Sequence, residues 1–362
     1  MTLQTKVLAG ALAIVFFGAA AIVASSPPMS LDPLAASNPS FPNFRSERPG
    51  RPEPDSGLPV LAERMPEFQG ITRWWQTPDG QPLTPEMLKG KVVLVDFWTY
   101  SCINCIRTYP FLRTMWERYA DKGLVIVGVH TPEFAFEKDP ENVERELKKN
   151  KLAWPIALDP DYGTWGAYNN RYWPAGYFFD RQGRLRHVHF GEGDYDESEA
   201  VIRELLEEGG AKLPSMGSAV QVPDFSKIRT PETYFGLERG AEFMGTPGKD
   251  GVTGDFTAAN DVAEDRWTAG GKWTFRPEYV QGDSAGALFR FSVQAGQLHL
   301  VLSSADGKDK NIEVFVDGKR LKGLKVNASQ LYDIAAFPDA GRHTVEVWVM
   351  DAGVRFYAAT FS

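Results

Sequence analysis

The sequence is poor in the residues that stabilise disulfide-rich scaffolds or bind nucleic acids. Only two of its 362 residues are cysteine, so a fold held by many disulfides is excluded. Acidic residues outnumber basic ones, 47 against 39, and the net charge of −8 excludes the chain as a whole from the nucleic-acid binders. Hydrophobic residues make up 43% and charged residues 24%, which is typical of globular proteins. The length predicts two folded domains with accessory segments.

Long apolar runs are also scarce, and the longest one occupies residues 7–24 (VLAGALAIVFFGAAAIVA). As a helix, a run of this length rises about 27 Å, close to the roughly 30 Å hydrocarbon core of a bilayer. Lys6 is the only basic residue before Arg45, so residues 1–6 are expected in the cytoplasm and the rest outside. We expect a transmembrane signal anchor in the cell membrane, with the bulk of the chain in the periplasm or another extracytoplasmic space. A signal peptide cleaved near Ala24, followed by secretion, is the alternative.

The remaining sequence divides into a spacer, a mixed domain, a second linker and an all-strand domain. Residues 25–63 are rich in proline and serine and predict an extended spacer. Residues 64–211 predict strands at 91–98, 123–129, 176–180 and 184–190, and helices at 102–119, 142–150 and 198–208. After a linker at 212–229, residues 230–362 show strands only, at 287–293, 297–303, 311–317, 343–350 and 354–361. This second pattern predicts an all-β sandwich of the jelly-roll kind.

The two cysteines, Cys102 and Cys105, are three residues apart where a predicted buried strand gives way to a predicted helix. Free backbone N–H groups and the helix dipole stabilise a thiolate at such a junction, and related motifs lower the thiol pKa from about 8.5 to roughly 3.5–7. The spacing predicts a redox-active disulfide, with Cys102 as the nucleophile and Cys105 as the resolving thiol. A zinc site would need further ligand pairs, and a structural bridge around so small a loop would stabilise little. Ile106 after Cys105 excludes a c-type haem attachment.

The sequence around the cysteine pair resembles the thioredoxin family. Val95-Asp96-Phe97-Trp98 followed by the pair is similar to thioredoxins, and residues 88–98 are similar to their membrane-anchored, TlpA-like redoxin branch. Segments 98–107 (WTYSCINCIR), 127–134, 170–175 and 189–195 are similar to the thioredoxin-like part of DipZ-type proteins. Segment 230–238 (TPETYFGLE) and the β-rich tail resemble the end of DipZ-type chains. The resemblance implies a thioredoxin fold over residues 64–211 and an extracytoplasmic thiol–disulfide oxidoreductase.

The resemblance also implies roles for three residues outside the pair. Asp96 takes the place of the buried carboxylate beneath the thioredoxin cysteines, where burial would raise its pKa and let it accept a proton from Cys105. Glu133 matches the active-site glutamate of TlpA-like reductases, with a solvated loop glutamate as the alternative. Pro174 matches the cis-proline that faces the disulfide.

Three aromatic residues are candidates for the substrate-binding surface. Trp173 precedes the proline and would offer its backbone to an incoming substrate strand. Together with Trp98 and Tyr100, it would form an apolar rim around Cys102. Each of the three could instead belong to the core.

The expected partners also follow from the resemblance. DipZ-type proteins usually carry a multi-helix, electron-conducting membrane domain, which a single apolar segment replaces in this sequence. We therefore expect a separate membrane electron donor of the CcdA/DsbD type. Exported proteins with disulfides are the expected substrates, and no cofactor, metal or nucleic acid is expected to take part.

The β-rich tail offers a second candidate surface. Alternation in the predicted strand 343–350 places Trp348 and Glu346 on the face opposite its valines, and Phe315 shares a face with Glu313. Aromatic rings on a polar sheet face can stack on sugar rings, so Trp348 and Phe315 form a candidate glycan platform for cell-envelope carbohydrate. Packing of these rings under another strand is the alternative.

Two other functions remain as alternatives. A redoxin-type thiol peroxidase would use Cys102 to attack a peroxide, although peroxiredoxins generally carry a Pro-x-x-x-Thr-x-x-Cys pattern and residues 98–101 contain no proline. The other alternative is a cell-envelope glycan-binding module in which the redox centre is accessory.

Overall fold

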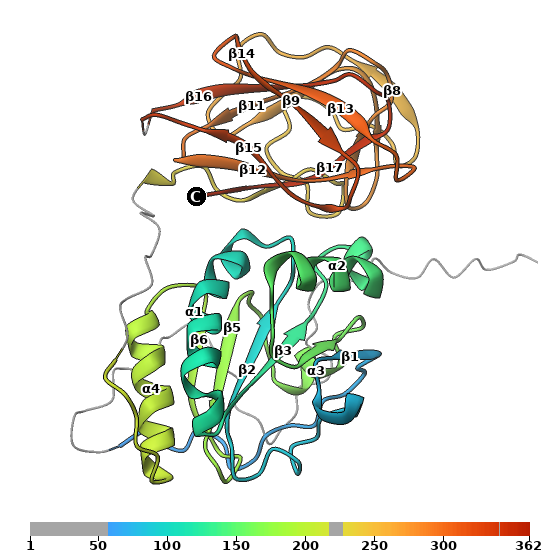
Figure 1. The fold of residues 1–362 in the computed structure, drawn as a ribbon. Helices are drawn as coiled ribbons and strands as arrows, with labels where there is room; N and C mark the ends of the chain where they lie inside the picture. Colours follow the sequence, from blue (N-terminus) through green and yellow to red (C-terminus); the bar gives the residue numbers. More distant parts are fainter. Residues whose placement is uncertain (1–56, 217–226, 340) are drawn as a thin grey trace, which may run out of the picture. The chain divides into compact units, whose positions relative to one another are not determined.

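The polypeptide folds as a mixed α/β domain followed by an all-β domain, as the sequence predicts. The computed structural model describes residues 57–216, 227–339 and 341–362 (Figure 1), and all of these belong to one compact unit. The predicted anchor at 7–24 lies outside the described residues. Within the described ranges, no helix is both long enough and apolar enough to cross a membrane.

A six-stranded sheet with the order β1-β4-β3-β2-β5-β6 forms the centre of the first domain. Strands β2 (Val92–Trp98), β3 (Leu124–His130) and β4 (Ile156–Leu158) are parallel to one another. The other three, β1 (Arg73–Trp75), β5 (Ala175–Phe179) and β6 (Leu185–Phe190), pair antiparallel with their neighbours. This is the mixed sheet of a thioredoxin-like domain.

Helices cover both faces of this sheet, which explains why β2 and β3 are continuous apolar runs. Residues of α1 (Ile103–Tyr119), α2 (Pro140–Asn150) and α4 (Tyr195–Glu208) share one buried cluster with β2. Residues of α3 (Gly163–Ala167) share the cluster on the other face with residues of the segment before β2. In Figure 1, α1 and α4 run roughly along the direction of the strands of this sheet. Three short 3-10 helices, η2 (Pro78–Gly80), η3 (Ala120–Lys122) and η4 (Ala135–Lys138), complete the domain.

The alternation along β2 decides which of its side chains face α1. Leu94 and Trp98 pack in the cluster that contains α1, whereas Val95 and Phe97 pack in the opposite cluster. Asp96 lies between Leu94 and Trp98 in this alternation and is itself buried. Its carboxyl group therefore lies on the side of the sheet that carries the cysteines.

The N-terminal boundary of this domain lies earlier than the sequence predicts. Residues 57–63 were expected to belong to the spacer, but Leu58 and Ala62 are buried. The backbone of Leu61 and Ala62 exchanges hydrogen bonds with Leu185 at the start of β6. In residues 57–63, proline and polar residues separate the apolar ones, so the segment has no helix or strand period that would predict its burial. Its order follows from its pairing with β6.

In the described part of the second domain, the named strands pair antiparallel with one another, and one isolated parallel bridge joins Phe243 to Trp267. The pairing path runs β14-β13-β16-β11-β9-β10-β17-β12-β15, with β7 paired to β17 and β8 to β9. The strands are β7 (Thr233–Tyr234), β8 (Thr253–Phe256), β9 (Trp267–Phe275), β10 (Val280–Gly282), β11 (Ala287–Val293), β12 (Gln297–Ser304), β13 (Lys310–Val316), β14 (Lys319–Val326), β15 (Gln330–Ala336), β16 (His343–Val349) and β17 (Val354–Phe361). All five strands predicted in this domain are present.

Along this path, strand β9 joins two sheets. One sheet contains β14, β13, β16 and β11, and the other contains β10, β17, β12 and β15. The first half of β9 pairs with β11, and its second half pairs with β8 and β10. Between the halves, Gly271 has a φ of +84°, a conformation that glycine adopts without steric cost. The strand can therefore bend at this residue and contribute to both sheets.

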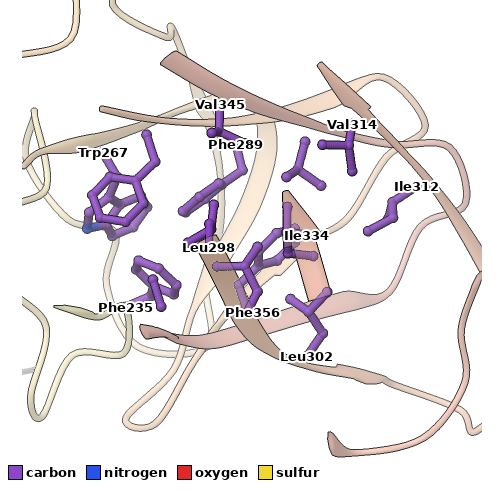
Figure 2. Packing of buried hydrophobic residues seen from close by; sticks show 14 of the residues in the cluster. Phe235, Trp267, Phe289, Leu298, Leu302, Ile312, Val314, Ile334, Val345 and Phe356 are labelled. Atoms are coloured by element: carbon purple, nitrogen blue, oxygen red, sulfur yellow. The ribbon is translucent and has the colours of Figure 1, made fainter. Parts of the chain in front are cut away.

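The two sheets enclose one apolar core. In β16, Val345, Val347 and Val349 are buried while the residues between them are half exposed, as the predicted alternation requires. Figure 2 shows the packing of Phe235, Trp267 and Phe289 in this core. The hairpin β13–β14 turns at Asp317 and Gly318, both with positive φ, the two-residue turn that an Asp-Gly pair favours.

Candidate redox site

The two cysteines lie at the beginning of α1, where β2 ends. Cys102 is the N-cap residue, and its sulfur accepts a hydrogen bond from the backbone N–H of Cys105 at 3.4 Å. Both residues are free thiols, Cys102 partly exposed and Cys105 fully buried. Burial, together with the hydrogen bond to Cys102, raises the pKa of Cys105 well above its usual value. Cys102 is thus the sulfur that a substrate can reach, whereas the buried Cys105 remains a protonated thiol.

Asp96 lies on the α1 side of β2 and is one of the groups that raise the pKa of Cys105. Burial raises the pKa of Asp96 itself to about 8, the direction that the resemblance implies. Asp96 also lines a small cavity together with Thr108, Pro174 and His189. A carboxyl group with such a pKa exchanges protons near neutral pH.

Glycines lie opposite Asp96 on both neighbouring strands. Asp96 is opposite Gly128 of β3 and opposite Gly176 of β5 in the sheet register. A Cβ atom at Gly128 would lie 3.0 Å from the Trp98 indole nitrogen and 2.5 Å from the Ile156 Cδ1 atom. The space opposite Asp96 on β3 is therefore filled by side chains of neighbouring residues, and only glycine fits there.

The peptide bond between Trp173 and Pro174 is cis, as the resemblance implies. Pro174 is buried and its carbonyl oxygen accepts a hydrogen bond from Gly191. Trp173 is half exposed, packs against Trp165 at 4.3 Å between ring centroids, and donates its indole N–H to the Thr131 carbonyl oxygen. Trp173 is therefore partly accessible at the surface, and its indole ring is held in place by Thr131 and Trp165.

Trp98 and Tyr100 do not form a rim around Cys102, which corrects the sequence-based interpretation. Each is about 1% exposed and belongs to the same core cluster as Cys105. Both rings pack against His130, whose pKa burial lowers to about 3. These side chains are fixed behind the cysteines because β2 and β3 are covered on both faces.

Glu133 is not a solvated loop residue, because its side chain is only 10% exposed. Its carboxylate accepts a hydrogen bond from the Tyr234 hydroxyl at 2.6 Å and pairs with Arg239 at 2.9 Å. Arg239 also lies over the Tyr234 ring, 3.4 Å from its centroid. Both partners lie at the beginning of the all-β domain: Tyr234 belongs to segment 230–238, which resembles DipZ-type chains, and Arg239 follows that segment directly.

Glu137 is a candidate site residue that sequence reasoning missed. It is fully buried in η4. One carboxylate oxygen accepts hydrogen bonds from the N–H and hydroxyl of Ser101, and the other accepts from the N–H groups of Glu133 and Phe134. A glutamate three residues into a short helix is a weak sign of N-terminal capping. Nothing in the sequence connects it with Ser101.

A second buried ion pair anchors the first turn of α1. Arg107, two residues after Cys105, pairs with Glu192, and their side chains are 13% and 8% exposed. The same guanidinium donates a hydrogen bond to the Phe361 carbonyl oxygen at the end of β17. The helix that carries the cysteines is therefore tied both to the β6–α4 loop and to the last strand.

The candidate glycan platform has the orientation that alternation predicts. Trp348 and Phe315 are half exposed on adjacent strands, opposite the buried valine face of β16. The Trp348 indole nitrogen donates a hydrogen bond to Glu346, which in turn pairs with Arg290. Glycan binding at this face remains a prediction.

Comparisons with known proteins agree with this architecture. Residues 61–205 match the family model described as Redoxin, and residues 230–362 match the one described as Thioredoxin like C-terminal domain. Protein DipZ of Mycobacterium tuberculosis is 39% identical over 258 residues, which is 70% of this chain and 36% of DipZ. The chain thus spans about a third of the length of that relative.

A shorter relative is matched over nearly its whole length. Thiol-disulfide oxidoreductase YkuV of Bacillus subtilis is 30% identical over 148 residues, covering 41% of this chain and 97% of YkuV. A solved thioredoxin-like protein in its oxidised form is 31% identical, with a TM-score of 0.37, covering 40% of this chain and 96% of that one. Since the family model, the relatives and the sheet topology agree, the chain belongs to the thioredoxin-like family of thiol-disulfide oxidoreductases.

Proposed function

We propose that this chain exchanges disulfides of exported proteins through Cys102 and Cys105, most simply by reducing them. The observation that carries the proposal is the pairing of a partly exposed sulfur at the N-terminus of α1 with a buried thiol in its first turn. A site of this kind presents one nucleophile to a large partner and keeps the second thiol ready inside.

The reaction transfers two electrons from the dithiol to the substrate disulfide. The Cys102 thiolate attacks one sulfur of the substrate, forms a mixed disulfide and expels the other sulfur, which takes up a proton. Cys105 then gives its proton to the carboxylate form of Asp96 and attacks Cys102. This second step closes the Cys102–Cys105 disulfide and releases the second substrate thiol. Asp96, with its pKa raised to about 8, is suited to take this proton near neutral pH.

The direct test replaces each cysteine separately. Cys102→Ser should abolish reduction of insulin disulfides, because no nucleophile remains. Cys105→Ser should instead accumulate mixed disulfides, because the resolving thiol is missing. Retained turnover in both variants would contradict the proposal. Rapid consumption of hydrogen peroxide by the wild type, without insulin reduction, would favour the thiol peroxidase alternative.

We also propose that the domain works outside the cytoplasm, held by an anchor at residues 7–24. The support is the charge pattern around that segment and the similarity to DipZ. The electrons would come from a membrane donor of the CcdA/DsbD type, since the described residues hold a single dithiol that must be reduced again after each turnover.

A further inference from the structure

A single buried carboxylate connects the two loops that flank the redox centre. Glu137 Oε1 lies 3.1 Å from the Ser101 nitrogen and 2.7 Å from its hydroxyl oxygen. Glu137 Oε2 lies 2.6 Å from the Glu133 nitrogen and 3.0 Å from the Phe134 nitrogen. Ser101 immediately precedes Cys102, so this carboxylate holds the backbone next to the nucleophile.

The same network continues into the all-β domain. The Glu133 backbone is held by Glu137, and the Glu133 side chain is held by Tyr234 and Arg239. The adjoining residues Phe134 and Phe136 pack against Tyr357 of β17. An unbroken series of contacts therefore runs from Arg239 through Glu133 and Glu137 to the residue before Cys102.

We propose that Glu137 and Arg239 are positioning residues for disulfide exchange, and that through them the C-terminal domain holds the loop that presents Cys102. This inference rests on the proposed function, because it assigns these residues to the reaction at Cys102. It gives the C-terminal domain a part in the redox chemistry in addition to any binding role.

The chemistry of Glu137 supports a positioning role over a merely stabilising one. Burial, with the charge of Glu133, raises the pKa of Glu137 to about 7, although its hydrogen bonds to Ser101 and Phe134 oppose this shift. Burying a carboxylate is costly. An apolar side chain would fill the same volume without that cost, but it could not accept bonds from two loops at once.

Arg239 contributes at the other end of the network. It pairs with a Glu133 side chain that is largely removed from water, and its guanidinium is stacked on Tyr234. Because both partners of Glu133 lie next to each other on the same domain, the orientation of Glu133 depends on the placement of that domain. Small displacements of groups beside a reacting atom can cost up to about a hundredfold in rate.

The test measures the chemistry of Cys102 directly in the full chain. The reduced protein is mixed with a small aromatic disulfide, Ellman's reagent, and the rate of thionitrobenzoate release is followed at pH 7. We expect Glu137→Gln to slow this rate about tenfold, and Ser101→Ala and Arg239→Gln to slow it about threefold each. In the insulin assay, the same variants should lower kcat with little change in KM, because none of these side chains is proposed to contact substrate.

Matched controls separate positioning from general loss of stability. Glu199→Gln removes another buried carboxylate, in α4, which accepts a hydrogen bond from the hydroxyl of Tyr119 at the far end of α1. Arg276→Gln removes a half-exposed arginine of the C-terminal domain that pairs with Asp250. Both controls are expected to retain the wild-type rate, whatever their melting temperatures.

A double-mutant cycle decides whether Glu137 and Arg239 act through one network. If they do, the Glu137→Gln/Arg239→Gln variant is no slower than Glu137→Gln alone. Wild-type rates in both single variants, or fully multiplicative effects in the double variant, would overturn the inference. Since Ellman's reagent reports on Cys102 without a protein substrate, failure of the wild type to reduce insulin would overturn only the proposed function.

Discussion

At the scale of single residues, the redox centre is surrounded by groups whose protonation is governed by burial. The pKa of Asp96 is raised to about 8 and that of Glu137 to about 7, in both cases chiefly by removal from water. His130, on the same side of the site, is kept neutral because burial lowers its pKa to about 3. At neutral pH, Asp96 is therefore mostly protonated, Glu137 is about half protonated and His130 is neutral, so protons can be exchanged with a buried thiol near this pH.

The raised pKa of Asp96 predicts how stability depends on pH. Between about pH 4 and pH 8 the folded protein keeps a proton that the unfolded chain has lost, so the free energy of unfolding falls as the pH rises. Asp96→Asn removes this dependence. The variant should be more stable than wild type by about 4 kcal/mol at pH 7 and by little at pH 4.

Urea unfolding of the reduced protein across pH 4–8 measures this difference. The same variant should slow the second step of insulin reduction, because Cys105 loses its proton acceptor. An unchanged pH dependence of stability would mean that Asp96 titrates normally in the folded protein.

At the scale of elements, the close packing of β2 and β3 leaves no room for a side chain opposite Asp96. Gly128 lies beside Asp96 in the sheet. The space that a side chain would need at this position is occupied by Trp98, Ile156 and Trp154. The glycine is thus required by close packing rather than by backbone conformation.

Gly128→Ala should destabilise the first domain by about 1–3 kcal/mol, because the new methyl group overpacks a filled core. It should also slow the exchange reaction by displacing Trp98 beneath the cysteines. Gly166 in α3 is the matched control, since a Cβ there would meet nothing within 4 Å and alanine favours a helix. Thermal unfolding of the two variants tests the contrast, and equal stability would contradict it.

At the scale of the whole molecule, the C-terminal domain contacts the redox domain at the loops that flank the active site. Arg239 and Tyr234 hold Glu133, Phe361 accepts a hydrogen bond from Arg107, and Glu278 accepts from the backbone of Ala135. An aromatic cluster of Phe134, Phe136 and Tyr357 fills the space beside these polar contacts. The position of these contacts suggests that the two domains act as one functional unit.

The expected anchor is also a property of the whole chain. Residues 7–24 should keep the protein in the membrane fraction after export, because an apolar helix of that length matches the bilayer core. Carbonate extraction followed by mass spectrometry of the N-terminus tests this expectation. A soluble form that begins near Ser25 or Pro27 would show cleavage instead. Deletion of residues 7–24 is the control and should leave the protein in the cytoplasm.

The sequence alone was sufficient to predict the features of this protein that depend on local patterns of residues. The continuous apolar run of β2 followed by Cys-x-x-Cys located the redox centre, and alternation located the buried face of β16. The short strand β4 and helix α3 were not predicted, because three and five residues carry too little pattern. Strand β9 was missed because Gly270 and Gly271 interrupt its alternation.

Only the tertiary structure decided which distant side chains meet at the site. Ser101 and Glu137 are 36 positions apart, and Glu133 and Arg239 are 106 apart. A hydrogen bond between such residues depends on the positions of strands and loops, which no local periodicity encodes. The same holds for Trp98 and Tyr100, whose aromatic character suits a rim or a core equally well. Packing in the cluster around α1 placed them in the core, and the hydrogen bonds of Glu137 to Ser101 connected a glutamate of η4 with the redox site.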